Sequence, residues 1–159
     1  EPPQSHKFAN FVYRKFIPLL NGTISYEHPA YGGKRIDVLV EDCSQRYTVA
    51  FEIKSSPADM KTKFGKNFVA ELNYLICPIE YICHGLKMLL DIGRLDDVGI
   101  IAIDMKGNTY EEVKLAKYYN GEDLQYWHEH LRRLGRFGCE ESLEHIGMIR
   151  GRETRNENT

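Results

Sequence analysis

The chain has 159 residues, enough for one domain, and its 42% hydrophobic content supports a packed core and excludes a disordered chain. Its net charge of −2 excludes a molecule whose whole surface attracts nucleic acid, so a phosphate-binding surface must be a local patch. No apolar run approaches the about 18 residues that span a bilayer, and no secretory leader is seen. We therefore expect a cytoplasmic protein with no membrane partner.

The first part of the chain is predicted to form a helix and then a strand. Apolar residues recur at helical spacing from Ser5, which can cap the helix, to about Leu20. Thr23–His28 alternates between apolar and polar residues, the pattern of a strand, and Pro29–Gly33 has the composition of a turn.

Two further strands are predicted around Arg35-Ile36-Asp37 and Phe51-Glu52-Ile53-Lys54, both in alternating segments. Ile36 is expected on the apolar face of the first strand with Val38 and Val40, and Asp37 on the opposite, polar face. In the second strand Glu52 and Lys54 are expected to share an exposed polar face. The short polar stretch between the strands predicts antiparallel neighbours, and matching registers would bring Asp37 beside Glu52.

The rest of the chain predicts alternating helices and strands. Ser56 is expected to cap a helix that runs to about Glu71. The last residues of the chain, Arg150–Thr159, are polar and are expected to fray. The other expected elements are a central strand Leu72–Cys77, a helix Ile79–Asp91, a fully buried strand Val98–Ile103, an edge strand Thr109–Leu115, and helices Glu122–Leu134 and Ser142–Ile149. This order predicts an α/β fold with a mixed sheet flanked by helices, a core over residues 1–120 and a helical C-terminal extension over 121–159.

The predicted polar face concentrates two carboxylates and one ammonium group. Asp37 and Glu52 are the kind of oxygen ligands that hard cations such as Mg²⁺ or Mn²⁺ take, and the Ile53 carbonyl can add a third oxygen. Lys54 can then orient a water molecule and stabilise the charge on a phosphate. The competing interpretation is structural, because Glu-x-Lys on an exposed strand face is usually a solvated ion pair.

Asp37 with Glu52-Ile53-Lys54 resembles the motif of the PD-(D/E)XK nuclease superfamily. A longer run, which adds Ser55–Asp59, Leu72–Pro78 and Asp97–Asp104, resembles the MmcB-like DNA-repair nucleases. The likeness covers roughly residues 33 to 115.

This resemblance implies a restriction-endonuclease-like fold and a metal-dependent nuclease that cuts DNA in repair or processing. It implies Asp37 and Glu52 as metal ligands and Lys54 as the catalytic ammonium group. The chain departs from the pattern in two ways: Ile36 stands where the motif has proline, and the first helix carries no acid. Glu27 on the first strand is therefore the nearest candidate for a further metal ligand.

Several other residues are candidates for contact with DNA. Lys61, Lys63 and Lys66 follow the predicted site and can bind phosphates, although a solvated helix face explains them equally well. Ser55 can also bond a phosphate. The C-terminal helices are the candidate interface of a homodimer. The alternative function is a catalytically inactive module of the same fold that binds DNA or a repair partner.

Overall fold

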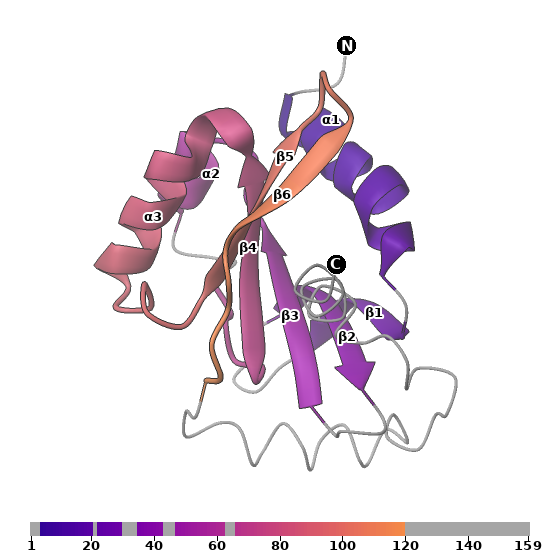
Figure 1. Cartoon of the computed structure of the whole chain (residues 1–159), viewed down its shortest axis with the longest axis vertical. Coiled ribbons are helices and arrows are strands. Elements are labelled where there is room, and N and C mark those ends of the chain that lie inside the picture. The colour runs from indigo at the N-terminus through magenta and orange to yellow at the C-terminus, as the bar shows by residue number, and fades with distance from the viewer. Residues whose placement is uncertain (1–3, 21, 30–34, 43–46, 63–65, 120–159) are drawn as a thin grey trace, which may run out of the picture.

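The fold is that of a computed structural model, which describes residues 4–20, 22–29, 35–42, 47–62 and 66–119. One six-stranded sheet, in the order β1-β2-β3-β4-β5-β6, forms its centre. Figure 1 shows α1 on one side of this sheet and α2 with α3 on the other. The predicted α/β class with a mixed sheet is therefore confirmed. The predicted C-terminal extension lies outside the described residues.

The strands combine antiparallel and parallel pairs. Strands β1 to β3 form an antiparallel meander, β3, β4 and β5 are parallel neighbours, and β6 returns antiparallel at the edge. The parallel pairs arise because helical connections cross over between β3, β4 and β5. The bounds are β1 Thr23–Pro29, β2 Arg35–Asp42, β3 Tyr47–Ile53, β4 Leu72–Pro78, β5 Gly99–Asp104 and β6 Thr109–Lys114.

The predicted first helix is a continuous helical run with two irregular stretches. Helix α1 spans Gln4–Phe11, a π-helical stretch follows over Val12–Phe16, and a 3-10 turn covers Ile17–Leu19. Pro18 lacks a backbone N–H and cannot continue the ordinary α-helical hydrogen bonds, which accounts for the change at this end. The run buries Phe8, Val12 and Phe16 against strand residues that include Phe51 and Tyr74.

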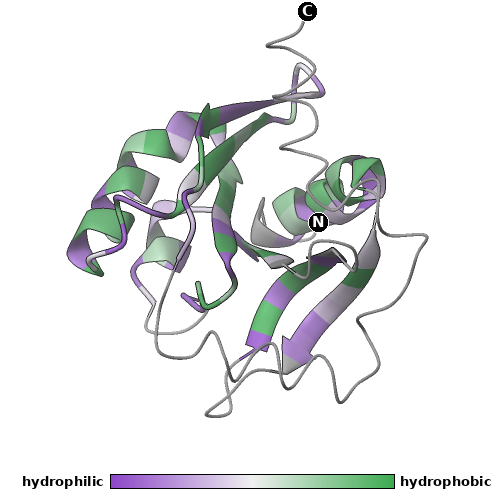
Figure 2. Ribbon diagram, turned by 60° about the horizontal axis from the view of Figure 1, so that its bottom comes forward, coloured by the Kyte–Doolittle hydropathy of each residue, from purple (hydrophilic) through white to green (hydrophobic). Residues whose placement is uncertain are grey.

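The second face of the sheet is covered by α2 (Pro57–Met60), α3 (Ile82–Asp91) and the segment 66–71. Met88 and Leu89 of α3 pack with Leu75, Cys77 and Ile100 of the central strands. Figure 2, coloured by hydropathy, shows hydrophobic residues running through the sheet and the helices on both sides. The central strands β4 and β5 are thus buried on both faces, as their apolar composition predicts.

The helix expected from Ser56 to about Glu71 is much shorter in the structure. It ends at Met60, and residues 66–71 contain no helix. The Asn73 side chain donates to the Ala70 carbonyl at 2.8 Å and accepts the Ala70 N–H at 2.9 Å, so these groups are bonded without a helix. Burial of Phe68 and Val69 against the sheet favours this extended path.

The helix predicted over Ile79–Asp91 begins with a 3-10 turn, Ile79–Tyr81, and continues as α3. Helix α3 ends at Asp91, and Gly93, two residues further on, has a φ of 72°, which glycine readily adopts. Among the described residues no helix is both long and apolar enough to cross a membrane.

Candidate functional site

Asp37 and Glu52 lie beside each other on neighbouring strands, and their side chains interact. They lie directly beyond Val38 of β2 and Phe51 of β3, the last pair in the register of these two strands. Asp37 Oδ2 accepts the backbone N–H of Ile53 at 2.8 Å, which ties the start of β2 to the end of β3. Opposite residues of antiparallel strands have side chains on the same face. The structure therefore brings the two acids together, as the matching registers predict.

Glu52 is completely buried, with 0% of its surface exposed. Burial, and then the negative charge of Asp37, raises the pKa of Glu52 to about 10, while the charge of Lys54 acts in the opposite direction. Its carboxyl group interacts with the Asp37 side chain, and this interaction also raises its pKa. A second buried negative charge beside Asp37 is costly. A cation placed between the two acids would remove that cost, so this pair of oxygen donors fits a hard divalent ion.

Asp37 is less buried than Glu52 and is held by the backbone. Burial raises its pKa above the ordinary value, and the N–H of Ile53 is the strongest influence in the opposite direction. Ile53 thus supports the site through its N–H group. The proposed use of its carbonyl oxygen as a metal ligand stays a prediction.

Lys54 is buried, and the expectation of an exposed polar face is wrong. Its exposed fraction is 4%, and its backbone N–H donates to the Ile76 carbonyl at 2.9 Å. The segment 66–71 and the helices α2 and α3 cover this face, so alternation predicted the direction of the side chain correctly but not its burial. The positive charge of Lys54 lowers the pKa of both Asp37 and Glu52.

Ile36 also departs from the expected arrangement. It packs with Leu39 and Ala50 on the α2–α3 side of the sheet, whereas Val38 and Val40 pack on the α1 side. Residues 36 and 39 are three apart, so strict alternation is broken at the beginning of β2, beside Asp37.

Asp59 is a member of the site that sequence reasoning did not assign. One oxygen of its carboxylate, Oδ1, lies 3.8 Å from Lys54 Nζ, and the other, Oδ2, accepts the N–H of Ser55 at 2.9 Å. Ser56 caps α2, as predicted, by accepting the Asp59 N–H at 3.1 Å. The local signal was the Ser-Pro-x-Asp spacing, which is typical of a helix start and gives no indication of the ion pair.

Glu27 and Asp37 lie between two register pairs of β1 and β2, Tyr26 with Val38 and His28 with Ile36, and are not themselves a pair of the register. Its φ of 47° is unusual for a residue other than glycine and interrupts the regular strand. Its side chain is exposed, and its charge acts on Tyr13. The role of Glu27 as a metal ligand stays a prediction.

Tyr13, in the π-helical stretch, is a second residue that sequence reasoning missed. Burial raises its pKa, and the charges of Asp37, Glu27 and Glu52 add to this effect. Its ring packs edge-on against Tyr26, with 5.7 Å between the ring centroids. The first helical run carries no acid. The group that this run brings near the carboxylates is instead the phenol of Tyr13.

Two of the predicted phosphate-binding lysines share a cavity. Lys61 and Lys66 line a space of about 270 Å³ between α2 and α3, together with His84 and Lys87 of α3. Lys87 forms an ion pair with Asp91, with 3.8 Å between Nζ and Oδ2. Lys63 lies outside the described residues.

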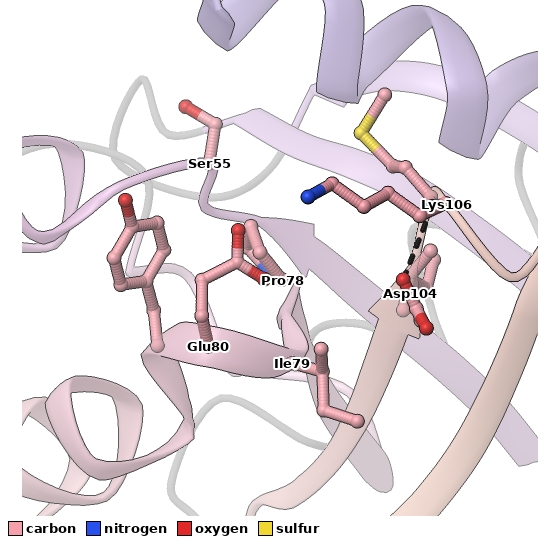
Figure 3. Close-up of a pocket in the computed structure, with 9 residues that line it drawn as sticks. Ser55, Pro78, Ile79, Glu80, Asp104 and Lys106 are labelled. Atoms are coloured by element: carbon pink, nitrogen blue, oxygen red, sulfur yellow. Dashed lines mark hydrogen bonds between the residues drawn. The ribbon is translucent and has the colours of Figure 1, made fainter.

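Ser55 lines a separate, larger cavity of about 720 Å³ at the ends of β3, β4 and β5 (Figure 3). Its hydroxyl group donates to Asp59 Oδ2 at 3.4 Å, a long hydrogen bond. Ser55 therefore joins this cavity to the group formed by Asp37, Glu52 and Lys54, although its proposed contact with phosphate stays a prediction.

In the part of the chain that the structure describes, no three His, Cys, Asp or Glu side chains form a group that could hold a metal ion. A cation at Asp37 and Glu52 would thus need further oxygen ligands from the backbone, water or substrate. The chain matches no protein-family model, no curated protein and no solved structure.

Proposed function

We propose that the chain is a metal-dependent nuclease with a restriction-endonuclease-like fold that hydrolyses phosphodiester bonds of DNA, in repair or processing. The observation that carries this proposal is the arrangement of Asp37 and Glu52 on adjacent strands with Lys54 beside them. The charge of Lys54 acts on both acids, and the Glu52 carboxyl group is completely buried beside Asp37.

The order of elements supports the choice of fold. A helix precedes a three-stranded antiparallel meander, and a short helix then leads into the parallel strand β4. The two acids and Lys54 are the residues on which the resemblance to the PD-(D/E)XK motif rests. Fold analogy alone does not define chemistry, so the proposal depends on the site.

Asp37 and Glu52 would hold Mg²⁺ or Mn²⁺ through carboxylate oxygens, and the Ile53 carbonyl is the candidate for a third protein ligand. The bound ion supplies positive charge to the phosphate and makes water more acidic. Ionisation of Glu52 requires this compensation, because burial favours its neutral form. Metal binding should therefore release a proton and strengthen as the pH rises.

Lys54 would orient the attacking water and stabilise the charge that develops on the phosphate oxygens. The water oxygen would attack phosphorus and lose one proton to solvent, the bond to the leaving sugar oxygen would break, and the leaving oxygen would take up one proton from solvent. Asp59 keeps the ammonium group near the acids through the ion pair at 3.8 Å. Its acceptance of the Ser55 N–H ties it to the same backbone segment.

The cavity between α2 and α3 supports contact with a polyanion. Lys61, Lys66 and Lys87 bring three ammonium groups to its wall, against one carboxylate from Asp91. The whole chain has a net charge of −2, so this local excess of positive charge is distinctive. Phosphates of a bound strand would neutralise it, and binding should weaken with salt.

The catalytic test is Lys54→Met, because methionine fills the buried space better than alanine. We expect a loss of DNA cleavage of about 100-fold or more in Mn²⁺, with the circular dichroism of the folded protein retained. Lys117→Met, at an exposed lysine outside the site, should cleave like the wild type. Wild-type cleavage by a folded Lys54→Met variant would refute the mechanism.

Metal binding is tested separately with Asp37→Asn, since asparagine can still accept the Ile53 N–H. Titration calorimetry with Mn²⁺ should show weaker binding than in the wild type, because one charged ligand is lost. Unchanged affinity would contradict the assignment of Asp37 as a ligand.

A second candidate function is a module that binds DNA without cutting it. The observation that favours it is the Lys54–Asp59 ion pair, which engages the ammonium group in a structural contact. Single-stranded, duplex and branched DNA, each incubated with Mn²⁺ and then with a chelator, distinguish the two functions. Cleavage that the chelator stops supports the nuclease, and salt-sensitive binding without cleavage supports the module.

A further inference from the structure

The cavity lined by Ser55 lies at the carboxyl ends of three parallel strands. Ser55 follows β3, Pro78 ends β4 and Asp104 ends β5, and these strands are parallel neighbours. In open α/β sheets ligands bind at this edge. The volume of about 720 Å³ is within the range of cavities that hold small organic molecules.

The wall of this cavity combines flat or apolar surface with a few polar groups. Pro78, Ile79 and Tyr81 supply the apolar part. Figure 3 shows the side chains of Glu80 and Lys106 reaching into the cavity from opposite walls. Asp104 Oδ1 accepts the backbone N–H of Lys106 at 3.1 Å, which orders the turn after β5.

The charges indicate which part of a nucleotide the cavity fits. Glu80 and Asp104 contribute two carboxylates against the single ammonium group of Lys106, so a phosphate would meet net repulsion. Carboxylates accept hydrogen bonds from the N–H groups on the edge of a nucleobase. An aromatic or apolar wall can stack against the face of the base. Phosphates are better matched by the lysines of the cavity between α2 and α3.

The cavity also adjoins the candidate catalytic group. Ser55 directly follows Lys54, and the Ser55 hydroxyl and the Lys54 ammonium group both contact the carboxylate of Asp59. A nucleotide next to a phosphate held at Lys54 would have its base within reach of this wall.

We propose that this cavity receives the unstacked base of a nucleotide flanking the phosphate that is cut, so that the substrate is single-stranded or locally opened DNA. This inference rests on the proposed function, because it places the phosphate at Asp37, Glu52 and Lys54. Bases inside a duplex cannot enter such a cavity without leaving the stack, which costs least in single strands and mismatches.

The first experiment measures binding by fluorescence anisotropy in Ca²⁺, with the full chain and a fluorescein-labelled single-stranded oligonucleotide. A series of oligonucleotides carries one abasic nucleotide at each position in turn. We expect one position at which loss of the base weakens binding about tenfold, because stacking and edge contacts are lost there. Equal affinity across the series would overturn the inference.

The second experiment fills the cavity. Ile79, which is 43% exposed, is replaced in Ile79→Trp, and the matched control is Leu90→Trp, at a residue that is 62% exposed on α3 and outside the cavity. Ile79→Trp should bind the intact and the most sensitive abasic oligonucleotide equally, whereas Leu90→Trp should retain the tenfold difference. A retained difference in folded Ile79→Trp would refute the placement of the base in this cavity.

The outcomes separate this inference from the proposed function. Position-dependent binding in a wild-type protein that cuts no DNA in Mn²⁺ would support the base cavity and refute the nuclease. Cleavage of DNA in Mn²⁺, together with equal binding of all the abasic oligonucleotides, would support the nuclease and refute the base cavity. Absence of DNA binding in any form would refute both.

Discussion

Replacing Glu52 by glutamine tests the physical basis of the site without DNA. Glutamine has nearly the shape of the neutral carboxyl group, which burial favours at position 52. In a metal chelator the variant Glu52→Gln should therefore fold at least as well as the wild type. It should also lose the dependence of stability on pH that Glu52 causes.

The magnitude follows from the raised pKa. The ordinary pKa of 4.5 applies to the unfolded chain, and the folded value is about 10. Between these values the folded state holds one proton that the unfolded state has lost, so this stabilising contribution is complete below 4.5 and decreases as the pH rises. The slope is about 1.4 kcal/mol per pH unit, or about 2.7 kcal/mol between about pH 5.5 and 7.5.

The assay is urea unfolding of both proteins in chelator at several pH values, followed by circular dichroism. The free energy of unfolding of the wild type should fall relative to Glu52→Gln by about 2.7 kcal/mol over that interval. The raised pKa of Asp37 gives a slope of the same sign that is largely shared by both proteins. Added Mn²⁺ should stabilise the wild type at the higher pH more than Glu52→Gln.

Glu71→Gln is the matched control, because burial also raises the pKa of Glu71, but only to about 7. The contribution of Glu71 to the free energy of unfolding should decrease between about pH 4.5 and 7 and then stay constant, whereas that of Glu52 should continue to decrease towards about pH 10. Parallel stability curves for the wild type and Glu52→Gln above neutral pH would show that Glu52 is ionised in the folded protein. The account of the buried acid pair would then be wrong.

Two further variants test how the site is supported. Ser56→Ala removes the acceptor of the Asp59 N–H and should lower the free energy of unfolding by about 1 kcal/mol, whereas Ser56→Asp should keep the cap; equal stability of all three proteins would exclude a capping role. Gly99→Ala would place a methyl group 2.5 Å from the Tyr74 ring and 2.6 Å from the Ala116 nitrogen. Urea unfolding should show a loss of about 1–3 kcal/mol, and wild-type stability would contradict the close packing of β5.

Local sequence patterns predicted the strands and the neighbouring acids. Alternation located β2 and β3, and a short polar connection implied their antiparallel pairing, which brings Asp37 beside Glu52. The N-cap at Ser56 was equally visible, because a cap depends on only four consecutive residues. These features are decided by backbone geometry and nearby residues, which the sequence displays directly.

Burial and contacts between distant segments needed the tertiary structure. Lys54 was expected in solvent but is covered, and its ion pair with Asp59 exists because α2 turns back over the end of β3. The helix after Ser56 ends at Met60, and in the non-helical segment 66–71 the Ala70 backbone is bonded by Asn73, a residue of β4. The cavity at Ser55 requires three strand ends brought together by crossovers.

The sequence by itself therefore indicated which residues could carry the proposed chemistry and, except at Ile36, the direction of their side chains along each strand. The tertiary structure decided how far these residues are shielded from water, which charged groups lie next to them and where a ligand can enter. The reason is that the direction of a side chain repeats with backbone geometry, whereas desolvation and charge interactions depend on every atom nearby in space. Glu52 shows both, since alternation predicted its face and only the folded core raises its pKa to about 10.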